Sequence, residues 1–193
     1  MRVLAVERAA GVKAFSFGRH AAIQGLAERN WKLAVGTALA LALIAWLAPQ
    51  LEDMLGRPHW IDPVALQILR WSGAGLFVVS GLIIVVAQRQ MGRSWRVGVP
   101  SEGPGDLVRH GLFAWSRNPI FVGLIAAMIA LFLWSPHIVT AALLASTWTL
   151  TLVQVRIEEE ALREKHGDAY ETYAAQVDRW IGRHRRKHFA AQP

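Results

Sequence analysis

Residues 119–155 read PIFVGLIAAMIALFLWSPHIVTAALLASTWTLTLVQV and contain no Asp, Glu, Lys or Arg. As a single helix this stretch would be about 55 Å long, whereas the hydrocarbon core of a bilayer is about 30 Å thick. The sequence Trp134-Ser135-Pro136-His137 supplies a break, because proline lacks an amide donor and disfavours helix in the residue before it. We therefore predict a hairpin of two membrane helices.

Two more apolar segments precede this hairpin. Residues 33–51 carry no formal charge, and residues 64–88 form a second segment, with Arg70 near one end beside the interfacial residue Trp71. The chain of 193 residues is 53% hydrophobic, which is too apolar for an ordinary soluble domain of this size. We predict an all-α, polytopic membrane protein with about four transmembrane helices, a C-terminal helical hairpin and a cytoplasmic C-terminal helix. Residues 156–177, with apolar positions at Leu162, Ala169, Tyr173 and Val177, should form this helix as a continuation of the last span.

The 21 Lys and Arg residues indicate the orientation. Six lie in residues 1–32, five in residues 89–117, eight from Arg156 onward, and none in the turn of the predicted hairpin. By the positive-inside rule, both termini and the 89–117 connection are cytoplasmic. We expect an integral protein of a prokaryotic cytoplasmic membrane. The net charge of +7 then reflects topology, and no nucleic-acid partner is expected.

The domain organisation is simple. We expect a cytoplasmic or interfacial N-terminal segment, residues 1–30, and a single membrane domain, residues 31–193, with a motif core at 88–181. Residues 1–30 lack the apolar run and cleavage site of a removed signal peptide. The absence of cysteine excludes disulfides and thiolate chemistry. The histidines show no metal-ligand spacing, so we expect no metal.

Two polar clusters flank the predicted hairpin, Arg117-Asn118-Pro119 before it and Glu158-Glu159-Glu160 after it. Both ends of an antiparallel hairpin emerge at the same membrane face, so the two clusters should meet. Three uncompensated carboxylates at that interface are unfavourable, and a cationic partner is expected: Arg117, Arg179 or a positively charged ligand such as a sulfonium. The simpler interpretations are a headgroup-anchoring arginine and a solvated glutamate run.

In their order along the chain, these motifs resemble the isoprenylcysteine carboxyl methyltransferase and phospholipid methyltransferase superfamily of integral membrane enzymes. The family's glycine-aromatic lead, Arg-(His/Asn)-Pro and later Gly are similar to residues 111–123. Its Glu-Glu-x-x-Leu, Gly-x-x-Tyr-x-x-Tyr and final Arg are similar to Glu158, Glu159, Leu162, Gly167, Tyr170, Tyr173 and Arg179. The sequence departs from the pattern at Asn118, where many members have His, and at Phe121, where many have Tyr.

The resemblance implies that S-adenosylmethionine binds at the cytosolic face and that a lipophilic acceptor enters from the bilayer. The implied cofactor-binding residues are Arg117, Asn118, Pro119, Gly123, Glu158 and Glu159. The implied substrate-binding residues are Trp115, Phe121, Tyr170 and Arg179, with Arg179 and Tyr173 as the catalytic residues. Membrane lipids are the other expected partners, and the oligomeric state stays open.

The acceptor and the reaction class have alternatives. Asn118 cannot act as a base at neutral pH, which favours an isoprenylcysteine-type carboxylate over the amine of a phospholipid N-methyltransferase, although a glutamate or water could serve an amine. An NADPH-dependent steroid or isoprenoid-type membrane reductase usually has the sequence Arg-His-Pro-Asn-Tyr here, whereas this chain has Ile120 and Phe121 at the last two of these positions. A non-catalytic scaffold that binds anionic lipid through residues 183–188 leaves the glutamate cluster without a purpose.

Overall fold

The computed structural model describes residues 58–92 and 105–182, together with five isolated positions, Gly36, Thr37, Ala40, Leu43 and Met54. The elements in these residues are all helical: α3 (Pro63–Met91), the 3-10 helix η3 (Gly111–Ala114), α4 (Pro119–Trp134), α5 (Ile138–His166) and α6 (Asp168–Ala174). This confirms the predicted all-α class. The predicted N-terminal segment, 1–30, and nearly all of the first predicted span, 33–51, lie outside the described residues.

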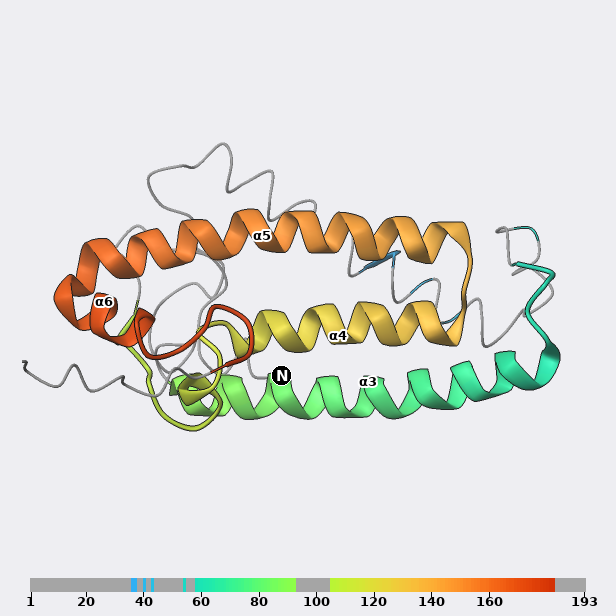
Figure 1. Ribbon diagram of the computed structural model, residues 1–193, viewed down its shortest axis with the longest axis horizontal. Coiled ribbons are helices and arrows are strands. Elements are labelled where there is room, and N and C mark those ends of the chain that lie inside the picture. The colour runs from blue at the N-terminus through green and yellow to red at the C-terminus, as the bar shows by residue number, and fades with distance from the viewer. Residues whose placement is uncertain are drawn as a thin grey trace, which may run out of the picture.

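The three long helices alternate in direction, and α4 lies between α3 and α5 (Figure 1). Both α3 and α5, at 29 residues each, are long and apolar enough to cross a membrane, whereas α4 is a shorter apolar helix of 16 residues. The predicted second apolar segment is thus a helix long enough to cross a membrane, and the predicted hairpin is present as two antiparallel helices, of which only α5 has that length. α5 extends past the N-terminal end of α4. The glutamates belong to this extended C-terminal part of α5 and therefore lie outside the apolar region.

Polar contacts stabilise the predicted break between α4 and α5. His137 caps α5: its Nδ1 accepts from the Thr140 amide at 3.2 Å, and its own amide donates to Thr140 Oγ1 at 3.2 Å. Arg70, on α3, donates from Nε to the carbonyl oxygen of Trp134 at 3.3 Å. The last carbonyls of a helix have no partner within the helix, so these contacts stabilise the turn that Pro136 initiates.

The outward face of α3 is apolar. It exposes large hydrophobic side chains along its length, at Val64, Ile68, Trp71, Phe77, Val78, Val79, Leu82, Val85 and Val86. A continuous exposed apolar surface of this kind is typical of a helix that contacts lipid. The exposure pattern therefore agrees with the expected membrane location.

Glycines bring α3 and α4 into close contact. A Cβ atom added at Gly73 of α3 would lie 2.7 Å from the Ala130 carbonyl oxygen and 2.9 Å from the Trp134 amide nitrogen. A Cβ atom at Gly123 of α4 would lie 2.6 Å from Ile84 Cγ1. Small residues allow membrane helices to pack closely. Gly123, which the family resemblance assigns to cofactor binding, thus faces α3, and helix packing accounts for the glycine.

The C-terminal helix differs from the prediction. The sequence predicted one helix that continues from the last span through residues 156–177, but α5 ends at His166. Gly167 has φ +49°, a left-handed conformation that glycine adopts without steric cost and that ends the helix. The reversed α6 and the residues after it bury Tyr170, Tyr173 and Val177 in a small core. This reversal directs residues 175–182 back towards the start of α4.

The close contact of α3 and α4 predicts an asymmetry among the glycines of α3. Gly73→Ala should destabilise the protein by about 1–3 kcal/mol, because the added methyl group meets backbone atoms of α4 that cannot move independently. Gly75→Ala is the matched control, since no atom lies within 4 Å of its added Cβ. The free energy of unfolding in detergent micelles gives the stability of each variant, and equal stability of the two would contradict the packing.

Candidate active site

Two segments that are far apart in sequence meet at the N-terminal end of α4. Residues 105–118 and 175–182 lie together there, beside the C-terminal half of α5 (Figure 1). The Arg117 amide donates to the Asp178 carbonyl oxygen at 3.0 Å, and the Gly182 amide donates to the Trp115 carbonyl oxygen at 2.8 Å. These backbone hydrogen bonds fix Arg179 next to the Arg117-Asn118 segment.

A buried carboxylate occupies the centre of this region. Glu159 is only 3% exposed. Arg179 donates to it from Nε, at 3.2 and 3.1 Å from the two oxygens, and from Nη2, at 2.8 Å from Oε2. Arg117 Nη2 lies 3.6 Å from Glu159 Oε1. The predicted cationic partner of the glutamates is thus confirmed for Glu159, and both candidate arginines contribute to it.

Asn118 joins the carboxylate to the C-terminal segment. Its Nδ2 group donates to Glu159 Oε1 at 3.0 Å and to the Arg179 carbonyl oxygen at 3.2 Å. Both amide hydrogens are therefore used, and Oδ1 is the group left for a ligand. Ser116 supports this arrangement, since its Oγ accepts from the Asn118 amide at 3.0 Å. Sequence reasoning missed Ser116, although it directly precedes the arginine of the motif.

The two tyrosines of α6, Tyr170 and Tyr173, are fully or almost fully buried. Tyr170 accepts from Arg117 Nη1 at 3.3 Å, and the Tyr173 hydroxyl donates to the Phe113 carbonyl oxygen at 2.7 Å. Burial raises the pKa of both hydroxyl groups, so both stay protonated at neutral pH. In this arrangement Tyr173 holds the 113–116 segment, and its catalytic role stays a prediction.

The other predicted residues lie at the edge of the site or outside it. Trp115 is 60% exposed, Phe121 is half-buried in the first turn of α4, and Pro119 is buried at its first position. Glu158 accepts a hydrogen bond from Gln154 at 2.9 Å and makes none of the contacts of Glu159. The structure therefore brings together Arg117, Asn118, Glu159, Tyr170 and Arg179, called here the Glu159 cluster.

The cluster has a fixed excess of positive charge, because two guanidinium groups face one carboxylate. The hydrogen bonds that Arg179 donates to Glu159 raise the pKa of the Arg179 guanidinium. This side chain is therefore charged at every physiological pH. Such a site suits an anionic ligand group beside one that is cationic or hydroxylic. The part of the chain that the structure describes contains no group of His, Asp or Glu side chains arranged to hold a metal ion.

Comparison with known proteins finds a family match and similar solved structures. The sequence model of the isoprenylcysteine carboxyl methyltransferase (ICMT) family matches residues 73–164, just under half of the chain. A solved structure of a eukaryotic intramembrane Ras methyltransferase, ICMT, aligns with a TM-score of 0.58 and 23% sequence identity, covering 77% of this chain and 50% of that one. No curated protein matches the chain.

The apolar hairpin with a buried ionic cluster at one end defines an integral membrane protein of the α-helical class. The match to the family's sequence model and the common fold both support the resemblance to the isoprenylcysteine carboxyl methyltransferase superfamily that the sequence shows. The chain spans about half the length of the solved methyltransferase, so its own reaction and substrates are matters for proposal.

The hydrogen bonds of Asn118 predict a specific response to substitution. Asn118→Asp keeps the size of the side chain but replaces a donor with a carboxylate 3.0 Å from Glu159 Oε1. Because like charges at this distance repel and the Arg179 carbonyl loses a donor, we expect a loss of about 1–3 kcal/mol of stability at pH 7. Stability should partly recover at low pH, where a carboxylate is protonated. Unfolding measured across pH tests this, and wild-type stability at pH 7 would refute it.

Proposed function

We propose that the protein transfers the methyl group of S-adenosylmethionine to a lipophilic acceptor that carries an isoprenylcysteine-type carboxylate, at the cytoplasmic face of the membrane. The observation that carries this proposal is the Glu159 cluster at one end of an apolar helical hairpin. Residues from both sides of the hairpin form the cluster, as a site between cytosol and bilayer requires. The match to the sequence model of the isoprenylcysteine carboxyl methyltransferase family supports the same reaction class.

The residues present fit S-adenosylmethionine. When bound, it supplies a sulfonium methyl group for displacement. Arg117 Nε is buried and has no hydrogen-bond partner within the described residues, so it offers a donor for a ligand carboxylate. The Oδ1 atom of Asn118 offers an acceptor for an ammonium or hydroxyl group. The cluster thus offers a donor for the carboxylate of this ligand and an acceptor for its ammonium or hydroxyl groups.

Differences in exposure support separate roles for the two arginines. The Arg117 side chain is 14% exposed, whereas that of Arg179 is 37% exposed at the edge of the cluster. The deeper Arg117 suits the cofactor. The planar guanidinium of Arg179 suits an anionic acceptor that arrives from outside. Glu159 holds this guanidinium in a defined orientation.

The proposed reaction needs positioning more than proton transfer. A carboxylate acceptor is already ionised at neutral pH, so no base is required. Asn118 cannot take a proton, and the excess positive charge of the cluster favours an anionic acceptor over a protonated phospholipid amine. Alignment of two reactants is worth roughly 7–11 kcal/mol of barrier. The fixed arginines of the cluster provide that alignment.

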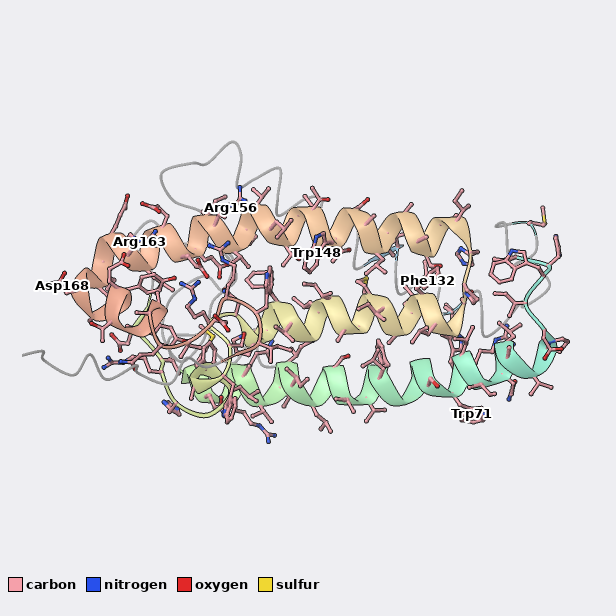
Figure 2. The ribbon with its side chains drawn as sticks, viewed as in Figure 1. Trp71, Phe132, Trp148, Arg156, Arg163 and Asp168 are labelled. Carbon is pink, nitrogen blue, oxygen red and sulfur yellow. The ribbon has the colours of Figure 1, made fainter. Side chains whose placement is uncertain are left out.

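The charge distribution supports a cytoplasmic location. Arg156 and Arg163 lie on the part of α5 near the cluster, whereas Trp71 lies at the opposite end of the helices (Figure 2). Arg117, Lys165 and Arg179 belong to the same end as the cluster. By the positive-inside rule this end faces the cytoplasm.

Binding of S-adenosylhomocysteine by the purified protein, measured by calorimetry, tests the proposed function. We expect binding of S-adenosylhomocysteine and none of NADPH. Glu159→Gln should weaken the affinity about tenfold or more, because it removes a charged partner from the cluster. Glu160→Gln is the matched control, since Glu160 is exposed and pairs with Arg163.

Two results would overturn the proposal. Binding of NADPH in place of S-adenosylhomocysteine would favour the reductase alternative. Unchanged S-adenosylhomocysteine affinity in a well-folded Glu159→Gln variant would place the cofactor elsewhere.

A further inference from the structure

The C-terminal end of α3 packs against η3, the 3-10 helix that precedes the Glu159 cluster (Figure 1). Gln90 of α3 makes the polar contact, since its Oε1 atom accepts from the Leu112 amide at 2.9 Å. Gly111 has φ +61°, and a Cβ atom added there would collide with the side-chain amide of Gln90. The glycine therefore gives the glutamine room to reach the backbone of η3.

Hydrogen bonds continue from this contact to the buried carboxylate. The Leu112 carbonyl oxygen accepts from the Ser116 amide at 3.0 Å, and Ser116 Oγ accepts from the Asn118 amide at 3.0 Å. Asn118 Nδ2 then donates to Glu159 Oε1 at 3.0 Å. Gln90 is thus linked to Glu159 by a series of hydrogen bonds, although no residue of α3 belongs to the cluster.

The helix η3 has a second anchor, on α6. The Tyr173 hydroxyl donates to the Phe113 carbonyl oxygen at 2.7 Å, and Phe113 is itself buried. The fold of η3 therefore does not depend on Gln90 alone. The Gln90 contact differs because it comes from a membrane helix that packs closely against α4. It defines where η3, and with it Asn118, lies relative to the membrane helices.

We propose that Gln90 is a positioning residue for the cofactor site, which holds η3 so that Arg117 and Asn118 lie within reach of Glu159. The inference rests on the proposed binding of S-adenosylmethionine, and it adds a residue outside the cluster on which that binding depends. Among the described residues, Gln90 makes no hydrogen bond to the cluster itself, so it acts through the backbone of η3. Binding groups need such outer contacts, because a shift of about 0.5 Å already lowers their effect.

Removal of the Gln90 acceptor tests this role. Gln90→Met keeps a long side chain without the acceptor. The Leu112 amide should then exchange with deuterium about tenfold faster, and the Kd for S-adenosylhomocysteine should rise about tenfold. Gln90→Glu retains an acceptor oxygen and should bring both values back to within about twofold of wild type. Gln88→Met is the matched control, since Gln88 lies on the same helix and its side chain makes no hydrogen bond to the described part of the chain.

A second variant tests the same bond without removing a polar side chain from this position. Gln90→Asn places the acceptor one methylene group further from η3, and it should show the same faster exchange and weaker binding as Gln90→Met. The KM for S-adenosylmethionine should rise in parallel with the Kd in both variants. Hydrogen–deuterium exchange and calorimetry in the same detergent provide the measurements.

The outcomes separate this inference from the proposed function. Faster exchange at Leu112 with unchanged S-adenosylhomocysteine affinity would overturn the inference, because the contact would then be structural only. Unchanged exchange in Gln90→Met, or binding by Gln90→Glu as weak as by Gln90→Met, would also overturn it. In these cases the wild-type protein still binds S-adenosylhomocysteine, and the proposed function stands. Absence of binding by the wild-type protein refutes the proposed function and this inference with it.

Discussion

The buried carboxylate of Glu159 is the constraint on which the arrangement of this end of the molecule depends. An unpaired charge at 3% exposure would cost several kcal/mol, so the chain must bring cations to it. No neighbour on α5 contributes those contacts. They come from Arg117, before α4, and from Arg179, after α6. The hairpin of α4 and α5 and the reversal at Gly167 are the two features that make both arginines available.

The packing of the apolar helices determines where the residues of the Glu159 cluster lie. Gly73 and Gly123 let α4 lie close against α3, which fixes where α4 begins and hence where Asn118 lies. At the other end, the His137 cap and the Arg70 contact fix the turn between α4 and α5. The position of α4 along the axis of α5 is thus fixed at both ends of α4. Asn118 and Glu159 come within hydrogen-bond distance as a consequence.

Features with a strong local or compositional signal could be predicted from the sequence. The break at Pro136 follows from helix length and proline chemistry, and the pairing of the glutamates with Arg117 or Arg179 follows from the cost of uncompensated charge. The turn at Gly167 could not be predicted, because a glycine within a helical sequence pattern adopts a left-handed φ only where tertiary contacts stabilise the reversal of the chain. The two hydrogen bonds that Asn118 donates go to residues 41 and 61 positions away, which periodicity does not reveal.

The central claim is that Glu159 and Arg179 act as one unit. A double-mutant cycle on the free energy of unfolding, with Glu159→Gln, Arg179→Gln and the double variant, tests it most directly. We expect a coupling energy above about 1 kcal/mol, because each single change removes an ionic partner from a buried or half-buried charge. The solvent-exposed Glu160–Arg163 pair provides the reference cycle and should be close to additive. Additive effects at Glu159 and Arg179, within about 0.5 kcal/mol, would contradict the account.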